Sequence, residues 1–305
     1  MRGTGDLSRD GYWRLMQRHC SLLLDLGSIL DATSVECVCV SHEGVIVTLT
    51  DGSRLHWDSQ EVREPASLLV ADGMYESGET EVLRRLCTQV DLFIDVGANT
   101  GYYPIILSRV NESMRIVAVE PVHATRMKLV TNLRLNNLED RVLVVGAALA
   151  DHAGETTMFL PEATGSVGSS LRDLHPDEVS GIESVEVTTL DEVLATTECT
   201  NLSTLVKIDV EGAEGLVLTG AQRLLSSGAL FVVELSRKWL AEFGSSATEI
   251  VQLFRGYGYH CYAIDTPAAN EALVSLVSEI DGETQAVNFL FIPIHRSSSL
   301  VSMLA

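Results

Sequence analysis

The stretch that decides the fold is D-L-F-I-D-V-G-A-N-T-G-Y-Y, residues 91–103. An apolar run ends at Asp95, and Gly97 and Gly101 follow with Asn99 between them. An unbroken apolar run followed by a glycine-rich turn indicates a buried parallel strand that leads into a helix. Ligands of open α/β sheets collect at such strand ends. The stretch therefore predicts an α/β fold with a binding site at this turn.

The same pattern continues towards the C-terminus. Short apolar runs without alternation indicate strands that are covered on both faces, and helical segments between them indicate parallel crossover connections. We therefore expect a doubly wound, mostly parallel sheet. The expected strands that follow the first lie at 115–120, 142–147, 204–210, 230–235, 259–265 and 286–293.

Two regions depart from this pattern. Residues 8–30 have the apolar spacing of an amphipathic helix ending near Gly27, and an antiparallel meander follows with a hairpin turn at Asp51-Gly52. Between 150 and 204 we expect an inserted pair of strands joined by a mobile loop at about 162–182.

These patterns divide the chain into three parts. Residues 1–75 are expected to form an appendage of one helix and a β-meander. Residues 76–295 form the α/β domain, and residues 296–305 form a C-terminal tail. The N-terminal helix and hairpin could either cover the sheet or mediate a homodimer, and the sequence does not decide between these roles.

The charge balance excludes some classes of partner. The chain has 21 basic and 42 acidic residues, a formal net charge of −21, which disfavours nucleic acid and anionic membranes. Its six cysteines show no zinc-site spacing and no disulfide framework. No apolar run approaches the roughly 20 residues needed to cross a bilayer. We therefore expect a soluble, cytoplasmic protein.

The turn at 97–101 distinguishes between cofactor classes. A dinucleotide-binding turn needs a middle glycine so that the backbone can approach a pyrophosphate, and here that position is Asn99. Asp95 would repel a phosphate but attract an ammonium or sulfonium group. S-adenosylmethionine has no phosphate and carries a positive centre, so it fits better. A tight turn without a ligand is the structural alternative.

Two further acidic segments belong to the same expected site. Glu120 ends the second strand, where a carboxylate accepts hydrogen bonds from both ribose hydroxyls. The segment V-K-I-D-V-E-G-A-E, residues 206–214, places Asp209 and Glu211 at the carboxyl edge of the sheet. Glu214 is expected in the first turn of the helix that follows, where a negative charge interacts favourably with the helix dipole, so it needs no role in the site.

Together these residues resemble the FkbM family of S-adenosylmethionine-dependent methyltransferases. The resemblance rests on F-I-D-V-G-A-N-T-G-Y-Y, V-E-P, V-K-I-D-V-E-G-A-E and Y-E-S-G-E at 75–79. It implies a class I, Rossmann-like methyltransferase fold and O-methylation of a sugar, polyketide or other secondary metabolite. It also implies a set of cofactor-binding residues, namely Asp95, Gly97, Asn99, Gly101, Tyr102, Glu120, Ala147 and Ala148.

Methyl transfer to an aliphatic hydroxyl needs a group that takes the proton, and the candidates are Glu211 and Asp209. A version assisted by Mg²⁺, with Glu234 as a third ligand, stays open but is less favoured, because Glu234 could instead pair with Lys207. Two other functions also stay open, an NAD-dependent oxidoreductase and a non-catalytic protein that binds S-adenosylmethionine. The acceptor molecule leaves no readable trace in the sequence.

Overall fold

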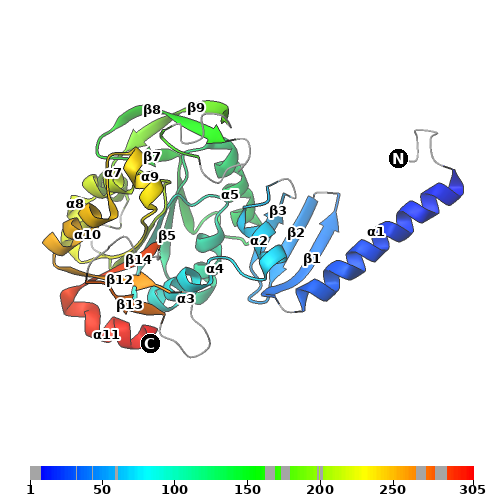
Figure 1. The fold of residues 1–305 in the computed structure, drawn as a ribbon, viewed down its shortest axis with the longest axis horizontal. Coiled ribbons are helices and arrows are strands. Elements are labelled where there is room, and N and C mark those ends of the chain that lie inside the picture. Colours follow the sequence, from blue (N-terminus) through cyan, green and yellow to red (C-terminus); the bar gives the residue numbers. More distant parts are fainter. Residues whose placement is uncertain are drawn as a thin grey trace.

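The computed structural model describes residues 8–31, 33–42, 44–58, 61–161, 169–172, 179–197, 199, 202–265, 273–278 and 287–305. Its centre is an eight-stranded sheet with the order β13-β12-β14-β11-β10-β4-β5-β6 (Figure 1). The strands of this sheet are β4 Leu92–Val96, β5 Arg115–Val119, β6 Val142–Val145, β10 Thr204–Ile208, β11 Leu230–Glu234, β12 Tyr259–Ile264, β13 Val274–Leu276 and β14 Asn288–Pro293.

The five strands β6, β5, β4, β10 and β11 run parallel, and β14 pairs antiparallel with both β11 and β12. Neighbouring residues of a strand enter different cores. Phe93 of β4 packs on one face and Ile94 on the other, and both are fully buried. Burial on both faces explains the unbroken apolar runs and confirms the expected doubly wound, mostly parallel sheet.

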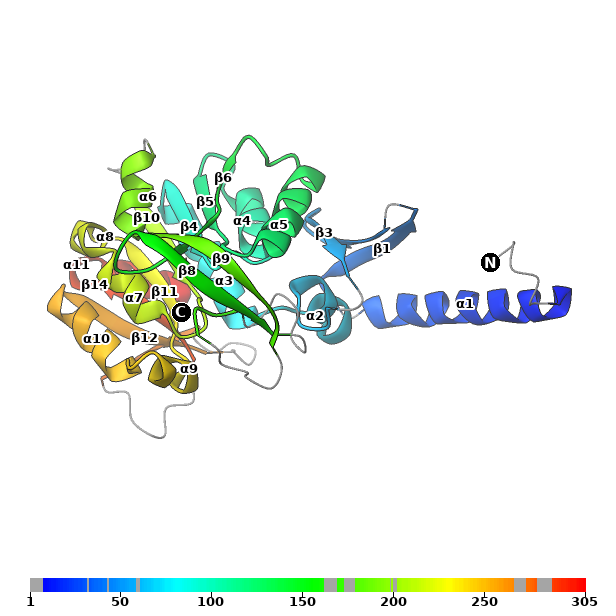
Figure 2. The same ribbon diagram turned by 90° about the horizontal axis from the view of Figure 1, so that it is seen from above.

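Helices cover both faces of the sheet (Figures 1 and 2). The helices of the first face are α3 Ser77–Leu86, α4 Tyr102–Val110, α5 His123–Leu135 and α11 Ile294–Leu304, and the short 3₁₀ helix η1 Cys87–Gln89 follows α3. The helices of the second face are α6 Leu190–Thr196, α7 Glu214–Thr219, α8 Gln222–Ser227, α9 Arg237–Glu242 and α10 Ala247–Gly256.

The end of the chain differs from the expected tail. Residues from Ile294 onwards form α11, whose Leu300 and Leu304 are buried in the first core. An i, i+4 pair of leucines lies on one face of a helix, which explains why this segment docks onto the domain.

The N-terminal region contains the expected helix and meander. Its elements are α1 Arg9–Leu30, β1 Val35–Ser41, β2 Gly44–Leu49, β3 Arg54–Trp57 and α2 Pro65–Asp72. Helix α1 continues three residues beyond the expected end at Gly27. The hairpin turn lies at Asp51-Gly52, where Gly52 has a φ of 81° and Asp51 accepts a hydrogen bond from the Ser53 amide.

Helix α5 anchors the meander through two asparagines. The Asn132 side chain accepts a 2.7 Å hydrogen bond from the His56 amide, and Asn136 accepts a 2.9 Å bond from the Arg54 amide. Both donors belong to β3, an edge strand of the meander. The asparagines therefore satisfy backbone groups that would otherwise be open to another strand.

The inserted strands are β8 Gly154–Pro161 and β9 Val179–Thr188, and a third strand, β7 Ala147–Leu149, joins them in the order β7-β9-β8. The run at 142–147, expected as one strand, is therefore divided. Its first part stays in the large sheet as β6, and β7 pairs in parallel with β9. Of the expected loop at 162–182, residues 162–168 and 173–178 lie outside the described residues.

Gly97 determines how closely the first turn approaches the end of β10. It has a φ of 86°, and a Cβ atom at this position would overlap the carbonyl oxygen of Asp209. A side chain here would therefore be strained and would push β4 and β10 apart at the edge where the pocket forms.

We predict that Gly97→Ala lowers the free energy of unfolding by about 3 kcal/mol or more, because backbone strain and overpacking add. Gly52→Ala is the matched control, since Gly52 has a similar φ of 81° but a Cβ atom there would meet no other atom within 4 Å. It should cost only about 1–2 kcal/mol. Urea unfolding measures both, and equal losses would show that the contact with Asp209 is unimportant.

Candidate active site

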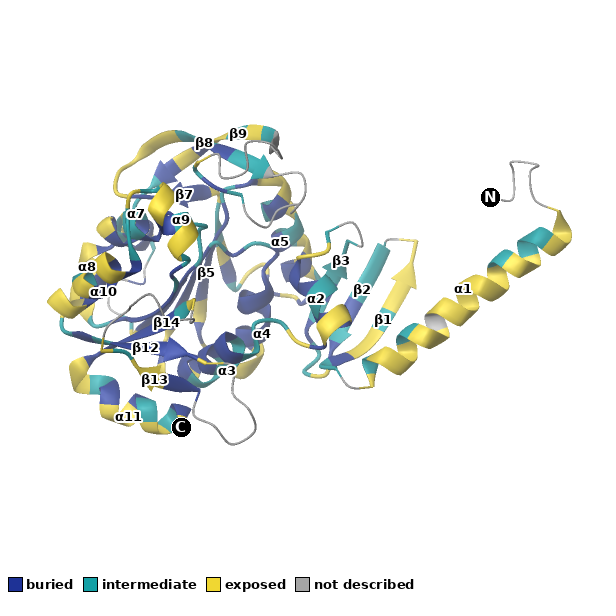
Figure 3. Ribbon diagram, viewed as in Figure 1, coloured by how far each residue is buried: buried dark blue, intermediate teal, exposed yellow. Residues whose placement is uncertain are grey.

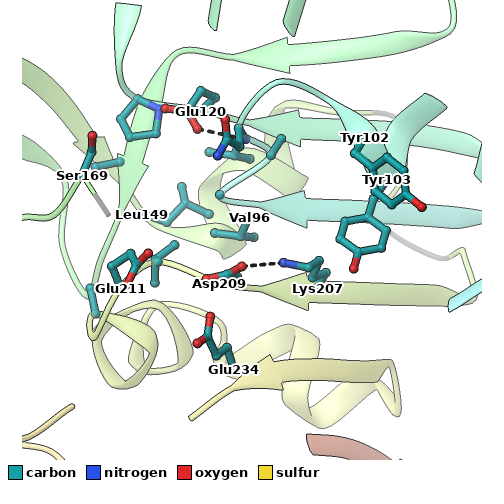
Figure 4. Close-up of a pocket in the computed structure, with 18 of the residues that line it drawn as sticks. Val96, Tyr102, Tyr103, Glu120, Leu149, Ser169, Lys207, Asp209, Glu211 and Glu234 are labelled. Carbon is teal, nitrogen blue, oxygen red and sulfur yellow. Dashed lines mark hydrogen bonds and ion pairs between the residues drawn. The ribbon is translucent and has the colours of Figure 1, made fainter. Parts of the chain in front are cut away.

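A pocket of about 280 Å³ opens at the carboxyl ends of β4, β5, β10 and β11 (Figure 4). Its floor comes from the ends of these strands and the turns that follow them. Met158, Ser169 and Leu171 approach from the insertion, and Tyr75 and Glu76 approach from the segment before α3. The pocket therefore combines groups from the sheet edge with groups from both additions to it.

Most of the expected site residues meet in this pocket. Those that line it are Gly97, Asn99, Tyr102, Glu120, Ala147, Ala148, Asp209 and Glu211. Asp95 and Gly101 do not line it. Asp95 is buried within β4, and Gly101 caps α4 with a φ of 88°, packed close to Leu129. These two residues therefore support the pocket from behind.

Glu120 is held by two backbone amides. Its carboxylate accepts a 3.1 Å hydrogen bond from the Asn99 amide and a 2.9 Å bond from the Val122 amide. Burial raises the pKa of Glu120 to about 7, although both amide bonds oppose the rise. The bonds connect the turn after β4 to the end of β5, so the two strand ends form one rigid surface.

Lys207 is a buried lysine in the middle of the parallel sheet. Its Nζ lies 2.9 Å from an Asp209 carboxylate oxygen and 3.5 Å from a Glu79 oxygen. It also lies 5.1 Å from the centre of the Tyr103 ring, at cation–π distance. A buried ammonium needs partners of this kind, and Lys207 obtains them from three different elements.

Several of the carboxyl groups near Lys207 lack their own hydrogen bonds. Both oxygens of Asp95 are buried without a hydrogen-bond partner, and burial raises the pKa of Asp95 to about 7. Burial likewise raises the pKa of Glu79 to about 8. One lysine does not neutralise this group of acids, so the site favours protons or a cationic ligand.

Glu76 connects this group to the aromatic wall of the pocket. The Tyr103 hydroxyl donates a 2.5 Å hydrogen bond to its carboxylate, and the ring of Tyr75 packs edge-on against Tyr102. Burial raises the pKa of Glu76 above its usual range. The carboxylate is thus fixed beside an apolar surface that can hold the body of a ligand.

The turn after β10 is fixed from two sides. Glu214 accepts hydrogen bonds of 3.2 and 3.1 Å from the amides of Val210 and Gly212, and the Ser170 hydroxyl donates to the Glu211 carbonyl at 3.2 Å. Glu214 therefore holds this turn in addition to lying at the start of α7. Glu211 itself has a φ of 52°, and burial raises its pKa to about 7.

The carboxyl groups of Asp209 and Glu234 lie near each other in the pocket, and Asp209 also pairs with Lys207 (Figure 4). Burial works against ionisation of Asp209, but the Lys207 charge outweighs it and lowers the pKa of Asp209. The Asp209 charge, with burial, raises the pKa of Glu234 far above its ordinary value. The pair therefore holds one proton, and that proton lies on Glu234.

Backbone strain is concentrated at this pocket. Among the described residues other than glycine, four have a positive φ, and three of these, Glu76, Asn99 and Glu211, line the pocket. The fourth is Asn137, at the end of α5. Strained residues of this kind persist where the surrounding structure over-determines them, and they cluster at functional sites.

The family model for the methyltransferase FkbM domain matches residues 95–261, which is more than half of the chain. This chain belongs to the FkbM methyltransferase family. The matched range begins at Asp95 and contains the glycine turn, Glu120, Asp209 and Glu211. Membership makes the protein an S-adenosylmethionine-dependent methyltransferase with the class I fold that the resemblance implied. Tyr75 and Glu76 lie before the matched range.

Solved structures with a similar chain include other methyltransferases. An FkbM methyltransferase from Methylobacillus flagellatus KT is 15% identical with a TM-score of 0.41, and the match covers 77% of this chain and 55% of that one. An O-methyltransferase from Bacillus cereus in complex with SAH is 14% identical with a TM-score of 0.40, covering 77% and 90% of the two chains. TomG, an O-methyltransferase of tomaymycin synthesis from Streptomyces achromogenes, is also 14% identical, with a TM-score of 0.40 and coverage of 78% and 92%. A search of curated proteins finds no match.

Sequence reasoning missed some pocket residues of this FkbM methyltransferase. Lys207 and Tyr103 were not expected in the site, and Glu234 was considered only as a metal ligand or a partner of Lys207. One signal was available, because a lysine inside the apolar run 204–208 has to find buried partners. Within the described part of the chain, none of the helices combines the length and apolar character needed to cross a bilayer.

We predict that the ligand-free protein loses stability between about pH 4 and pH 7. The pKa of Asp95 and of Glu120 is about 7 in the folded state, against about 4 in an unfolded chain. The folded state therefore binds more protons, and this stabilisation, complete below about pH 4, is lost as the pH rises through 7. Each group contributes a slope of at most about 1.4 kcal/mol per pH unit.

Urea unfolding at several pH values measures this slope in the wild type and in Asp95→Asn. The variant keeps the shape of the side chain but has no proton to lose, so its free energy of unfolding should fall less steeply with pH. Identical slopes in the two proteins would contradict the assignment of a raised pKa to Asp95.

Proposed function

We propose that this FkbM methyltransferase methylates a hydroxyl group of a small molecule and that Glu211 accepts the proton of that hydroxyl. The observation that carries the proposal is the state of Glu211 in the pocket. Its carboxyl group lines the cavity, burial raises its pKa to about 7, and its backbone is held in a strained conformation. A general base is most effective when its pKa lies near the working pH.

The residues at the glycine turn fit the cofactor. Both carboxylate oxygens of Asp95 are buried without a hydrogen-bond partner, and they lie behind a turn whose glycine leaves no room for a side chain. An orphaned buried acid favours a positive group nearby. In this arrangement Gly97 and Asn99 would hold the methionine part, with Asp95 behind them.

Glu120 and the start of β7 would hold the adenosine part. Each Glu120 oxygen accepts one backbone amide and keeps a free lone pair, so the carboxylate can still accept hydrogen bonds from two ribose hydroxyls. Ala147 and Ala148 lie beside Leu149 on the pocket wall, where they present a flat apolar surface suited to an adenine ring.

S-adenosylmethionine supplies an activated methyl group at this place. The chain has to hold the acceptor oxygen in line with that group, exclude water and remove a proton. The aromatic wall of Tyr75, Tyr102 and Tyr103 excludes water from one side, and Met158 and Leu171 cover the other. Glu76 and Ser169 are the polar groups that would orient the acceptor.

Asp209 is less suited to take the proton. It is paired with Lys207 and with the protonated Glu234, and its lowered pKa makes it a weak base. We therefore assign Asp209 a positioning role, in which its charge raises the pKa of Glu211.

The cofactor assignment predicts selective stabilisation by ligands. S-adenosylmethionine or its demethylated product should raise the melting temperature, and NAD should not, because only a ligand that binds the folded state stabilises it. Stabilisation by NAD alone would support the oxidoreductase instead.

We predict that Glu120→Gln weakens cofactor binding about tenfold, because the amide loses the charge that strengthens bonds from two hydroxyls. Isothermal titration measures the Kd. The matched control is Glu155→Gln on the exposed part of β8, which should leave the Kd unchanged. An unchanged Kd in Glu120→Gln would remove the ribose role from Glu120.

We predict that Glu211→Gln lowers kcat about 100-fold or more while the cofactor Kd stays within about threefold of the wild type. In the wild type, kcat should rise with pH through about 7, because Glu211 acts in its ionised form, and this dependence should disappear in the variant. A product screen by mass spectrometry over hydroxylated sugars and polyketides supplies the acceptor for this assay.

Glu242→Gln, on the exposed side of α9, is the control for this substitution and should leave kcat unchanged. A wild-type rate in Glu211→Gln would rule out Glu211 as the base. If no hydroxylated acceptor is turned over although the cofactor binds, the non-catalytic binding protein becomes the better description.

A further inference from the structure

Helix α1 extends away from the rest of the molecule (Figures 1 and 2). Its 22 residues are exposed or only partly buried along the described positions, including large apolar side chains (Figure 3). Leu22 is 57% exposed and Ile29 is 51% exposed. An isolated helix of this length is marginal in water, since helices in proteins are stabilised mainly by packing of an apolar face. The helix therefore lacks a packing partner over most of its length.

One stripe of α1 has the spacing of a coiled coil. Near its C-terminal end, Leu26 and Leu30 pack against the core beside Val38 of β1. The stripe that contains Leu26 continues outwards in alternating steps of three and four residues, which is the a/d pattern of a heptad repeat. Its positions are Tyr12, Leu15, His19, Leu22, Leu26 and Ile29.

The charge of α1 differs from that of the chain around it. The whole chain has a net charge of −21, which opposes the approach of two copies. Helix α1 itself has three arginines against two aspartates, so it is nearly neutral. Two copies can therefore meet along this helix with less repulsion than at the acidic remainder of their surfaces.

The charges also distinguish two ways of pairing. Arg18 and Asp25 flank the stripe on the same side, one heptad apart, and both are exposed. In an antiparallel pair with His19 level with Leu22 of the second copy, each Arg18 lies near Asp25 of the second copy. In a parallel, in-register pair the two residues lie one heptad apart along the seam, so Arg18 of one copy does not meet Asp25 of the other. Opposite charges that flank the apolar seam of a coiled coil set the orientation of its helices.

We propose that α1 is a dimerisation element that pairs antiparallel with α1 of a second copy of this chain. The two-fold axis crosses the helix between His19 and Leu22, so two equivalent Arg18–Asp25 ion pairs form, one on each side of the axis. The apolar stripe of one copy covers that of the other, which gives the outer turns of α1 the partner that they lack in a single chain.

The first test measures the molecular mass of the full chain by sedimentation equilibrium over a range of concentrations. We expect a monomer–dimer equilibrium in the wild type. Leu22→Glu should raise the dimer Kd at least about tenfold, because it places a carboxylate in the apolar seam. Ser21→Glu, at an exposed position outside the stripe, is the matched control and should leave the Kd within about threefold of the wild type.

The second test examines the orientation. Arg18→Asp and Asp25→Arg should each weaken the dimer, because each creates two like-charged pairs across the seam. The double variant exchanges the charges and should return the Kd to within about threefold of the wild type. Circular dichroism of each variant shows whether α1 remains helical, so that loss of pairing is distinguished from loss of the helix.

Three results would overturn the proposal. One is a wild-type chain that is monomeric at every concentration tested. Another is a dimer that Leu22→Glu leaves intact. The third is a dimer that Leu22→Glu dissociates but in which the charge-exchanged double variant stays as weak as the single variants, since this rejects the antiparallel arrangement. Binding of monomers to vesicles of anionic lipid, with no dimer, would assign the helix to a membrane surface instead.

Discussion

The active site depends on one buried ammonium group at the end of the central sheet. Lys207 is the cation among acids that come from α3, β4, β10 and β11, and it decides which of them ionise. Lys207 lowers the pKa of Asp209 against the effect of burial, and the Asp209 charge, with burial, raises the pKa of Glu234. Burial, and after it the same Asp209 charge, raises the pKa of Glu211. Burial and this one ammonium charge together therefore govern the ionisation of the acids around Lys207.

This arrangement requires the strand ends to lie very close together. Asp95 and Lys207 are paired neighbours on β4 and β10, and Gly97 allows the turn after β4 to contact the backbone of Asp209. If these strands were held further apart, a lysine and its acids could not share one dry pocket. In the function proposed above, the glycine turn therefore serves the catalytic half of the site as well as the cofactor half.

The sequence allowed the sheet, its parallel order and most of the pocket to be predicted, because these follow from local patterns. Apolar runs mark the strands, and the residues that end them must lie at one edge. The links from Lys207 to Glu79 and from Tyr103 to Glu76 could not be predicted, since they join residues far apart in the chain and leave no periodic pattern. The division of 142–147 between two sheets was missed for a similar reason, because only pairing with β9 distinguishes β7 from β6.

Asn132 gives the meander a mechanical connection to the cofactor turn. Its side-chain oxygen accepts from the His56 amide of β3, and its side-chain nitrogen donates a 2.8 Å bond to the Thr100 carbonyl, one residue before Gly101. A displacement of β3 relative to α5 breaks the first bond and frees the second to rearrange. The meander consequently helps to hold the turn in place. A truncated chain that begins at α3 would lack β3, and the Asn132 side-chain amide would lose the hydrogen bond that orients it.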